Sequence, residues 1–258
     1  MLQVEALVKS FDDFKAVNGA DLHVGKGEIV AVIGPNGAGK TTIFNCISGI
    51  YRPNSGKIFF KEEDITYLRP DQVAKKGIAR TFQNIELFSH MSTMDNLMLG
   101  RHVHMKTGVW GGATFIYGGS RAAREEIEHR GKVEEVIDFL ELQAARNQFV
   151  INLPYGTRKL VELGRALALE PALILLDEPS AGMNMEEKGD LMFSIQDIRD
   201  DLGITVLLVE HDMNLIMDVS DRILALNFGE RIAEGLPQEI QSHPEVLKAY
   251  LGEEEKVA

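Results

Sequence analysis

Three short stretches of the chain are apolar at nearly every position. They are residues 28–33, 172–176 and 204–209, and all three are rich in Val, Ile and Leu. Strands that are buried on both faces have this continuous apolar pattern, which is typical of the centre of a parallel sheet. The sequence therefore predicts an α/β fold with a mostly parallel central sheet.

The N-terminal part and the segment after residue 220 have a different pattern, in which short strands alternate with turn residues. The predicted strands are 2–8, 20–24 and 57–60 near the N-terminus, and 222–226 and 231–233 near the C-terminus. The last two flank Asn227-Phe228-Gly229-Glu230 and predict a hairpin. We therefore expect an N-terminal antiparallel β part beside the parallel sheet.

From about residue 90 to 165 the pattern is mostly helical. Residues 121–142 place five apolar side chains near one face of a predicted helix, with charged side chains opposite: Ile127, Val133, Val136, Ile137 and Leu140. We expect one domain, 1–258, in which a helical subdomain, 85–165, is inserted into a catalytic core formed by 1–84 and 166–258. Inside the insert, 108–119 combines glycines with aromatic residues, as a partner-binding loop or a mobile anchored loop would.

A second helix is predicted after residue 184. Asn184 and Glu187 have the spacing of a capping box at its start. Leu191, Ile195, Ile198 and Leu202 recur on one face, and Gly203 is a stop signal.

The segment after the first central strand fits the phosphate-binding pattern G-x-x-x-x-G-K-[ST] at every fixed position. Its residues are Gly34, Pro35, Asn36, Gly37, Ala38, Gly39, Lys40, Thr41 and Thr42. Glycine lets successive backbone N–H groups turn towards an anion, and the start of the following helix favours negative charge. Lys40 supplies a positive charge for the β- and γ-phosphates, and the Thr41 hydroxyl is placed to bind Mg²⁺. The sequence therefore predicts a nucleoside triphosphate site.

Two further predicted strands end in polar residues. Asp177 and Glu178 follow 173–176, and His211 follows 206–209. Ligands of open α/β sheets bind at the carboxyl ends of the strands. Asp177 suits a Mg²⁺ contact, Glu178 suits the polarisation of attacking water, and His211 suits a hydrogen bond to the γ-phosphate. Gln83, after a short extended run, is placed to sense the same phosphate through Mg²⁺ or water.

Composition narrows the class of protein. The formal net charge is −12, which argues against a nucleic-acid partner. The chain lacks both the pattern of a signal peptide and an apolar run of the ~20 residues that a membrane span needs. A lone cysteine, Cys46, cannot form an internal disulfide and is interpreted as a packed thiol. A cytosolic protein is expected.

The order of these motifs resembles the ATP-binding subunits of ABC transporters over nearly the whole chain. The matching segments are 34–42, Arg80-Thr81-Phe82-Gln83 as the Q-loop, 153–157 as the signature, Asp177-Glu178 as Walker B with the catalytic carboxylate, 180–184 as the D-loop, and His211 as the switch histidine. Phe11 stands where the family has an aromatic residue that stacks on adenine. The resemblance implies ATP and Mg²⁺ as cofactors, with Thr41, Gln83 and Asp177 at the metal.

The Arg-Thr-Phe-Gln run, the Ala-Gly-Met-Asn D-loop and the ending 247–252 resemble the subfamily of branched-chain amino-acid importers. The signature departs from the family's Leu-Ser-Gly-Gly-Gln. Pro154 replaces the serine and has neither hydroxyl nor N–H, Tyr155 replaces a glycine, and Gly156 remains. The resemblance implies that Pro154, Tyr155 and Gly156 contact the nucleotide of an opposing subunit, through backbone groups and the helix dipole.

The resemblance implies two partners besides ATP, which are a second ATPase subunit (the same chain or a paralogue) and integral-membrane permease subunits. It also implies a position at the inner face of the membrane. One alternative is a soluble ATP-gated scaffold of the same fold without a transporter. A P-loop kinase is another, but it would lack the paired signature and switch motifs. The transported solute is left open, because it never touches this subunit. We also expect residues 84–100, including Phe88 and Met91, to form either a groove for a permease helix or part of the core.

Overall fold

The computed structural model describes residues 1–105 and 121–257, with side chains described for 1–105 and 123–250. The glycine- and aromatic-rich segment 108–119 thus lies outside the described residues. The chain divides into two compact units, Met1–Gln83 with Ala172–Ala258, and Asn84–Pro171. The predicted second boundary, at residue 165, falls inside a helix that the structure continues to Leu167. Arg101 binds the carbonyl oxygen of Ala168, which keeps the end of that helix in the second unit.

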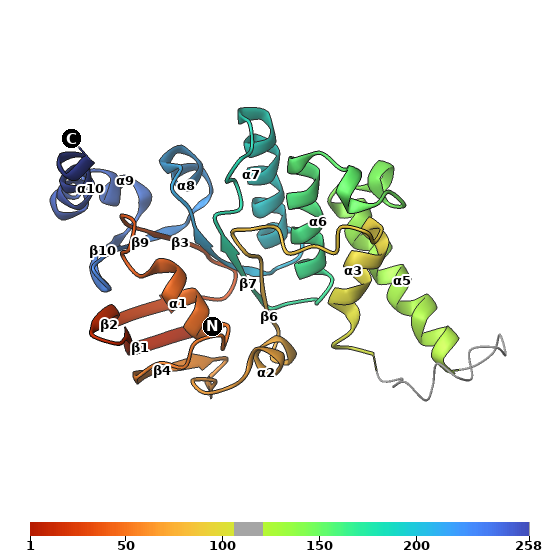
Figure 1. Cartoon of the computed structure of the whole chain (residues 1–258), viewed down its shortest axis with the longest axis horizontal. Helices are drawn as coiled ribbons and strands as arrows, with labels where there is room; N and C mark the ends of the chain where they lie inside the picture. Colours follow the sequence, from red (N-terminus) through yellow and green to blue (C-terminus); the bar gives the residue numbers. More distant parts are fainter. Residues whose placement is uncertain (106–120, 258) are drawn as a thin grey trace. The chain divides into compact units, whose positions relative to one another are not determined.

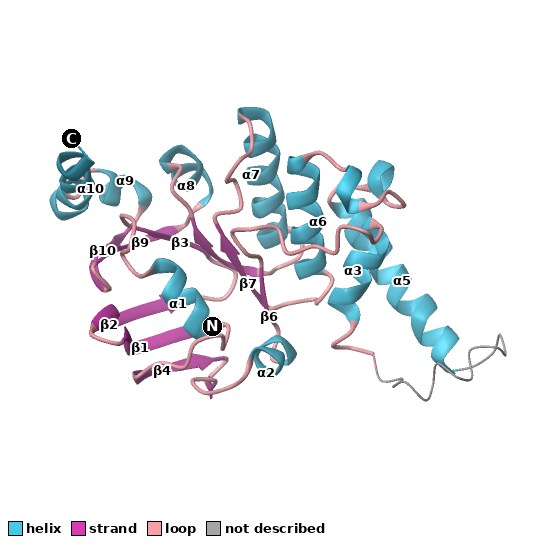
Figure 2. Ribbon diagram, in the orientation of Figure 1, coloured by secondary structure: helices cyan, strands magenta, loops and turns pink. Residues whose placement is uncertain are grey.

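The larger sheet of the first unit has the strand order β10-β9-β3-β8-β7-β6 among the described residues (Figures 1 and 2). Its strands are β3 (Ile29–Ile33), β6 (Ile78–Arg80), β7 (Leu173–Asp177), β8 (Thr205–Val209), β9 (Arg222–Asn227) and β10 (Glu230–Gly235). Every neighbouring pair is parallel except β9–β10, which is the predicted hairpin. The predicted mostly parallel central sheet is confirmed.

The two faces of β3 contribute to two separate cores. Val30 and Val32 belong to a cluster with residues of the helix that follows the strand, α1 (Lys40–Ile47). Ala31 and Ile33 belong to a second cluster, on the opposite face. The helices that contribute to this second cluster are α8 (Met213–Val219), α9 (Pro237–Gln241) and α10 (Pro244–Val257). Burial on both faces explains why β3 is apolar throughout.

The smaller sheet is antiparallel, with the order β2-β1-β4-β5. Its strands are β1 (Leu2–Phe11), β2 (Phe14–Val24), β4 (Ser55–Phe60) and β5 (Glu63–Asp64), and α2 (Pro70–Lys75) follows. Helix α1 lies between the two sheets (Figure 1), and Ile43, Phe44 and Ile47 are almost fully buried there. The predicted N-terminal antiparallel part is confirmed. It packs on α1, whose other side packs on the parallel sheet.

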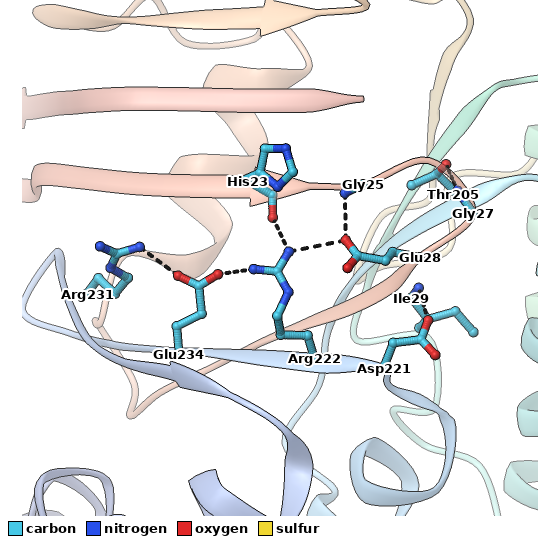
Figure 3. A network of polar contacts seen from close by, with 10 residues as sticks. All are labelled: His23, Gly25, Gly27, Glu28, Ile29, Thr205, Asp221, Arg222, Arg231 and Glu234. Carbon is cyan, nitrogen blue, oxygen red and sulfur yellow. Dashed lines mark hydrogen bonds and ion pairs between the residues drawn. The ribbon is translucent and has the colours of Figure 1, made fainter.

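A polar network centred on Arg222 connects the turn before β3 with β9 and β10 (Figure 3). The guanidinium donates to the carbonyl oxygen of His23 over 2.7 Å, and it forms ion pairs with Glu28 and Glu234. Nearby, Asp221 accepts a hydrogen bond from the backbone N–H of Ile29 at 2.8 Å. These contacts fix the entry of β3, the strand that leads into the phosphate-binding segment.

The second unit consists of helices in the residues that the structure describes. They are α3 (Thr93–Arg101), α5 (Arg121–Phe139), α6 (Tyr155–Leu167) and the 3₁₀ turns Gln143–Ala145 and Val150–Asn152. Leu97, Val133 and Ile137 are completely buried in this unit. Ile127 was expected on the same apolar face, but its side chain is 70% exposed. Helical spacing fixes the direction of a side chain, whereas its burial depends on how far the neighbouring helices reach.

Helix α7 (Met185–Asp200) begins with the predicted capping box. Asn184 accepts hydrogen bonds from the N–H groups of Glu186 and Glu187, and the Glu187 side chain accepts one from the N–H of Asn184. Leu191, Ile195 and Ile198 are buried as expected. Leu202 is half-exposed, because the helix ends at Asp200 and no longer directs this side chain to the buried face. Among the described residues, no helix is both long and apolar enough to cross a membrane.

Candidate functional site

The phosphate-binding segment leaves β3 at Gly34 and enters α1 at Lys40. Gly34 has a φ of 151°, and a Cβ atom there would lie 2.2 Å from the carbonyl oxygen of Leu226. Gly39 has a φ of 98°, and a Cβ atom there would lie 2.4 Å from the carbonyl oxygen of Ala16. Both positions therefore require glycine, because their φ angles are positive and because a Cβ atom would clash with a backbone carbonyl oxygen.

Lys40 is 6% exposed although it carries a charge. Its ammonium donates hydrogen bonds to the carbonyl oxygens of Gly34, over 2.6 Å, and Pro35, over 3.0 Å. The side chain thus folds back along the loop that it follows. This places a positive charge inside the curve of the loop, where an anion would be held.

A pocket of about 300 Å³ opens over this loop. The residues that line it are Phe14, Ala16, Asn36, Gly37, Ala38, Gly39, Lys40, Thr41, Thr42, Gln83, Glu178 and His211. Ten of these twelve are predicted site residues, all but Phe14 and Ala16. The structure therefore brings the phosphate loop together with three polar side chains that follow β6, β7 and β8.

Glu178 links these polar side chains. One carboxylate oxygen accepts a hydrogen bond from Nε2 of Gln83 at 2.8 Å, and the other lies 2.9 Å from Nε2 of His211. Glu178 also has a φ of +48°, and its N–H donates to the carbonyl oxygen of Val209 at 2.9 Å. A non-glycine residue in the left-handed region carries strain of about 1–3 kcal/mol, which is characteristic of functional sites.

Asp177, one residue earlier, forms an ion pair with Arg80, with 2.9 Å between Oδ2 and Nη2. Burial raises the pKa of the Asp177 carboxyl; Arg80 opposes this rise, and Glu178 adds to it. Arg80 also donates to Asn45, at 2.7 Å, and to Ser48, at 2.9 Å, both in or directly after α1. The second Asp177 oxygen, Oδ1, is buried and has no hydrogen-bond partner in the described residues.

Two aromatic residues lie near the turn between β1 and β2. Phe11 was expected to stack on adenine, but it is not among the residues that line the pocket; its ring contacts Tyr51 edge-to-face, with 5.2 Å between centroids. Phe14 lines the pocket instead and is 62% exposed. The sequence pattern cannot separate the two, because they lie three positions apart on either side of one turn.

Glu210 is a buried acid that the motifs did not single out. It is 3% exposed, and its two oxygens accept hydrogen bonds from the backbone N–H groups of Ser180, at 2.8 Å, and His211, at 3.0 Å. The Glu210 carboxylate thus connects Ser180, which lies two residues after Glu178, to His211, whose side chain contacts Glu178. The signal in the sequence was a glutamate directly after the apolar run 204–209.

The signature residues lie in the helical unit, at the start of α6. Pro154 is the N-terminal capping residue, and its carbonyl oxygen accepts from the N–H of Arg158 at 3.0 Å. Pro154 and Tyr155 are exposed, whereas Gly156 is buried. The exposed surface at this helix start is therefore made by Pro154 and Tyr155.

A glycine loop between a parallel strand and a helix, with carboxylates at the end of a second strand, defines a P-loop nucleotide-hydrolysing protein. Comparison with known families specifies the class further. Residues 17–181 match the family described as ABC transporter, and residues 230–256 match the family described as branched-chain amino acid ATP-binding cassette transporter. The chain belongs to the ABC transporter family, and the expected fold and ATPase class are confirmed.

Similar proteins match nearly the whole length of the chain. It is 40% identical over 253 residues to BraF, a high-affinity branched-chain amino acid transport ATP-binding protein of Pseudomonas aeruginosa, with 98% of each chain covered. It is equally identical, with the same coverage, to LivG of Salmonella typhimurium, described in the same words. A solved structure of the ADP conformation of an ABC transporter cassette matches with a TM-score of 0.84 and 30% identity, and 98% of each chain is covered. A cassette of this family therefore binds nucleotide.

Proposed function

We propose that this chain is the ATP-hydrolysing subunit of an importer for branched-chain or related hydrophobic amino acids. The observation that carries the proposal is the pocket in which Gln83, Glu178 and His211 face the phosphate loop. The relatives named above support the solute class, since two of them are described as branched-chain amino acid transport proteins. No feature of the described residues favours the soluble scaffold.

The phosphate loop binds the triphosphate in this proposal. Backbone N–H groups of residues 36–42 surround the phosphates, and the buried Lys40 ammonium, positioned by the Gly34 and Pro35 carbonyls, donates to a phosphate oxygen. Phe14, exposed at the pocket, offers its ring to the adenine base. That Phe11 stacks on adenine stays a prediction. Measuring the ATP affinity of Phe11→Ala and of Phe14→Ala shows which of the two rings contacts the base, because that variant should bind ATP more weakly.

Glu178 acts as the base that polarises water. Its carboxylate is held between Gln83 and His211, so its direction is set before the nucleotide arrives. His211 lines the same pocket and donates to the γ-phosphate when that phosphate is present. The strained backbone of Glu178 is one more restraint on the carboxylate position.

The residues present also fit a magnesium ion. Asp177 has a buried oxygen without a hydrogen-bond partner, and Thr41 and Gln83, whose side chains carry a hydroxyl and an amide oxygen, line the pocket. Magnesium prefers such hard oxygen ligands and is held through few protein groups together with phosphates. When bound, Mg²⁺ neutralises charge on the β- and γ-phosphates.

The second unit supplies contacts to two partners in the proposal. Pro154, Tyr155 and Gly156 at the start of α6 face the nucleotide of a second ATPase subunit, the same chain or a paralogue. Backbone N–H groups at the helix N-terminus replace the hydroxyl that Pro154 lacks. The site is thereby completed by a second chain.

An apolar patch on the second unit is the proposed contact for a permease. The backbone of 89–92 pairs with that of 149–151 through hydrogen bonds of 3.0–3.1 Å and one β-bridge. Phe88, Phe149 and Ile151 are 57%, 54% and 52% exposed on these adjoining segments. Buried Asn96 holds the first segment by exchanging hydrogen bonds with both backbone groups of Phe88. In the proposal, this patch binds a helix of an integral-membrane subunit, and the chain works at the cytoplasmic face of the membrane.

Calorimetry with ATP tests the nucleotide site, in comparison with Lys40→Ala. Wild-type protein should bind ATP and the folded variant should bind it far more weakly; equal affinity would contradict the proposed site. Purification from membranes tests the transporter assignment. Wild-type protein should copurify with integral-membrane subunits, and Phe88→Asp should not, although its ATP affinity is unchanged. Loss of folding in Phe88→Asp would instead show that Phe88 belongs to the core.

A further inference from the structure

The C-terminal helix α10 contacts the first residue of the phosphate loop. The Tyr250 hydroxyl accepts a hydrogen bond from the backbone N–H of Gly34 at 2.9 Å, across 216 positions of sequence. Tyr250 lies in the segment 230–256 that matches the branched-chain amino acid transporter family. A residue near the end of the chain is thus part of the nucleotide site's support.

Gly34 is held on both sides of its Cα atom. Its N–H is bound by Tyr250, and its carbonyl oxygen accepts from the Lys40 ammonium at 2.6 Å. Its Cα faces the Leu226 carbonyl oxygen too closely for any side chain. Because glycine alone leaves φ and ψ free, these contacts set the orientation of the carbonyl that holds Lys40.

The position of Tyr250 is itself fixed by the sheet that carries the loop. Val246, four positions earlier and therefore on the same helix face, is buried in the cluster that contains Ala31 and Ile33 of β3. The Tyr250 ring packs against the same cluster. Leu247, by contrast, is 48% exposed. The helix that carries the Tyr250 hydroxyl to Gly34 is therefore packed against the same sheet as the loop.

We propose that Tyr250 is a positioning residue for nucleotide binding, which holds Gly34 and through it the Lys40 ammonium. Tyr250 is not among the residues that line the pocket. It keeps the first residue of the phosphate loop in the conformation that binds phosphate. Nucleotide binding then costs less conformational entropy, because this part of the loop is already ordered. The inference rests on the proposed ATP site, and wild-type binding tests that site independently.

Tyr250→Phe tests the inference, because it removes the hydroxyl and keeps the packed ring. Affinity for ATP and ADP, measured by calorimetry, should fall roughly 5–10-fold, as expected for one lost hydrogen bond. KM for ATP should rise by the same factor while kcat stays unchanged, since Tyr250 does not touch the reacting atoms. Leu247→Ala, on the exposed side of the same helix, is the matched control and should leave both constants unchanged.

A double-mutant cycle shows whether Tyr250 acts through Lys40. In the Lys40→Ala background, Tyr250→Phe should cause no further loss of nucleotide affinity. Additive losses would overturn the route through Lys40. Wild-type affinity in Tyr250→Phe would overturn the whole inference, even if its melting temperature were lower, because the hydroxyl would then serve stability alone. Absence of binding by the wild-type protein would instead contradict the proposed function.

Discussion

Arg80 and Asp177 form a buried ion pair between the ends of two neighbouring strands, β6 and β7. The Nη2–Oδ2 distance is 2.9 Å, and the side chains are 6% and 2% exposed. Arg80 also lies over the rings of Phe44 and Phe82, at 5.8 and 4.9 Å from their centroids. Removing one partner of a buried ion pair strongly destabilises the fold, because the other charge is left buried and unpaired.

We expect Arg80→Met to destabilise the protein by about 3–5 kcal/mol, because it leaves the Asp177 charge buried and unpaired. Removal of Arg80 also removes the main influence that lowers the pKa of Asp177, whose pKa is already raised by burial. A carboxyl whose pKa is higher in the folded state than in the unfolded state contributes stability at a pH below its unfolded-state pKa. That contribution is lost as the pH rises through its folded-state pKa. Urea denaturation should therefore show a deficit that grows from low to neutral pH.

The matched control for Arg80→Met is Arg69→Met. Arg69 pairs with Asp71, but these side chains are 67% and 53% exposed. An exposed pair contributes about 0–1 kcal/mol, so this variant should unfold almost as the wild type does. Similar free energies of unfolding for the two variants would contradict the argument from burial.

Glu178→Gln should abolish most of the hydrolysis and keep nucleotide binding. The variant retains the size of the side chain and loses the base, which typically contributes 10²–10⁴-fold to the rate. Turnover is measured by phosphate release and binding by calorimetry. Turnover within a few-fold of wild type would exclude Glu178 as the base.

Glu210→Gln should slow hydrolysis without weakening nucleotide binding. The amide keeps one acceptor oxygen, so one of the two N–H groups, of Ser180 or His211, is left facing a donor. One buried unsatisfied donor costs about 1–3 kcal/mol, and we expect kcat to fall by about tenfold. Glu187→Gln, at the exposed cap of α7, is the control and should leave kcat unchanged. An equal loss of nucleotide affinity in Glu210→Gln would show a general defect instead.

Cys46 should be unreactive in the folded protein. It is 1% exposed, and burial raises its pKa to about 11, although Lys9 lowers it slightly. At pH 8 the reactive thiolate is then on the order of one part in a thousand. A thiol reagent should label the native protein far more slowly than protein unfolded in urea, which offers one thiol per chain. Rapid stoichiometric labelling of native protein would contradict the interpretation as a packed thiol.

The sequence was sufficient for the parts of the site that lie in contiguous motifs. The loop 34–42, Glu178 and His211 each follow an apolar strand, and parallel strands end at the same edge of a sheet, so their convergence could be predicted. Gln83 was predicted on weaker grounds, and it lies at Glu178.

The supporting residues could not be predicted in the same way. Tyr250, Glu210 and the pairing of Arg80 with Asp177 depend on contacts between distant segments, and no local spacing encodes them. Ile127 and Leu202 show the corresponding limit for the core. Helical periodicity gives the direction of a side chain, whereas its burial depends on which neighbouring element covers it.

The last prediction is that each active site is shared between two subunits. The phosphate loop surrounds a triphosphate from one side, and the exposed start of α6 offers backbone N–H groups for the other. Gly156→Asp brings a carboxylate to that helix start, where it repels phosphate. ATP binding to the single chain should survive, whereas ATP-dependent dimerisation and hydrolysis should fail. Light scattering in the Glu178→Gln background, which keeps ATP intact, measures dimerisation.

Because Gly156 is buried and Tyr155 is 39% exposed, Tyr155→Asp separates a lost contact from a folding defect. It should fail to dimerise while its melting temperature stays at the wild-type value. If the chain forms homodimers, mixing Gly156→Asp with Lys40→Ala protein gives dimers in which one site combines an intact loop with an intact signature. Such a mixture should recover hydrolysis that neither parent has. ATP-dependent dimerisation of both acidic variants at wild-type strength would rule out the shared site.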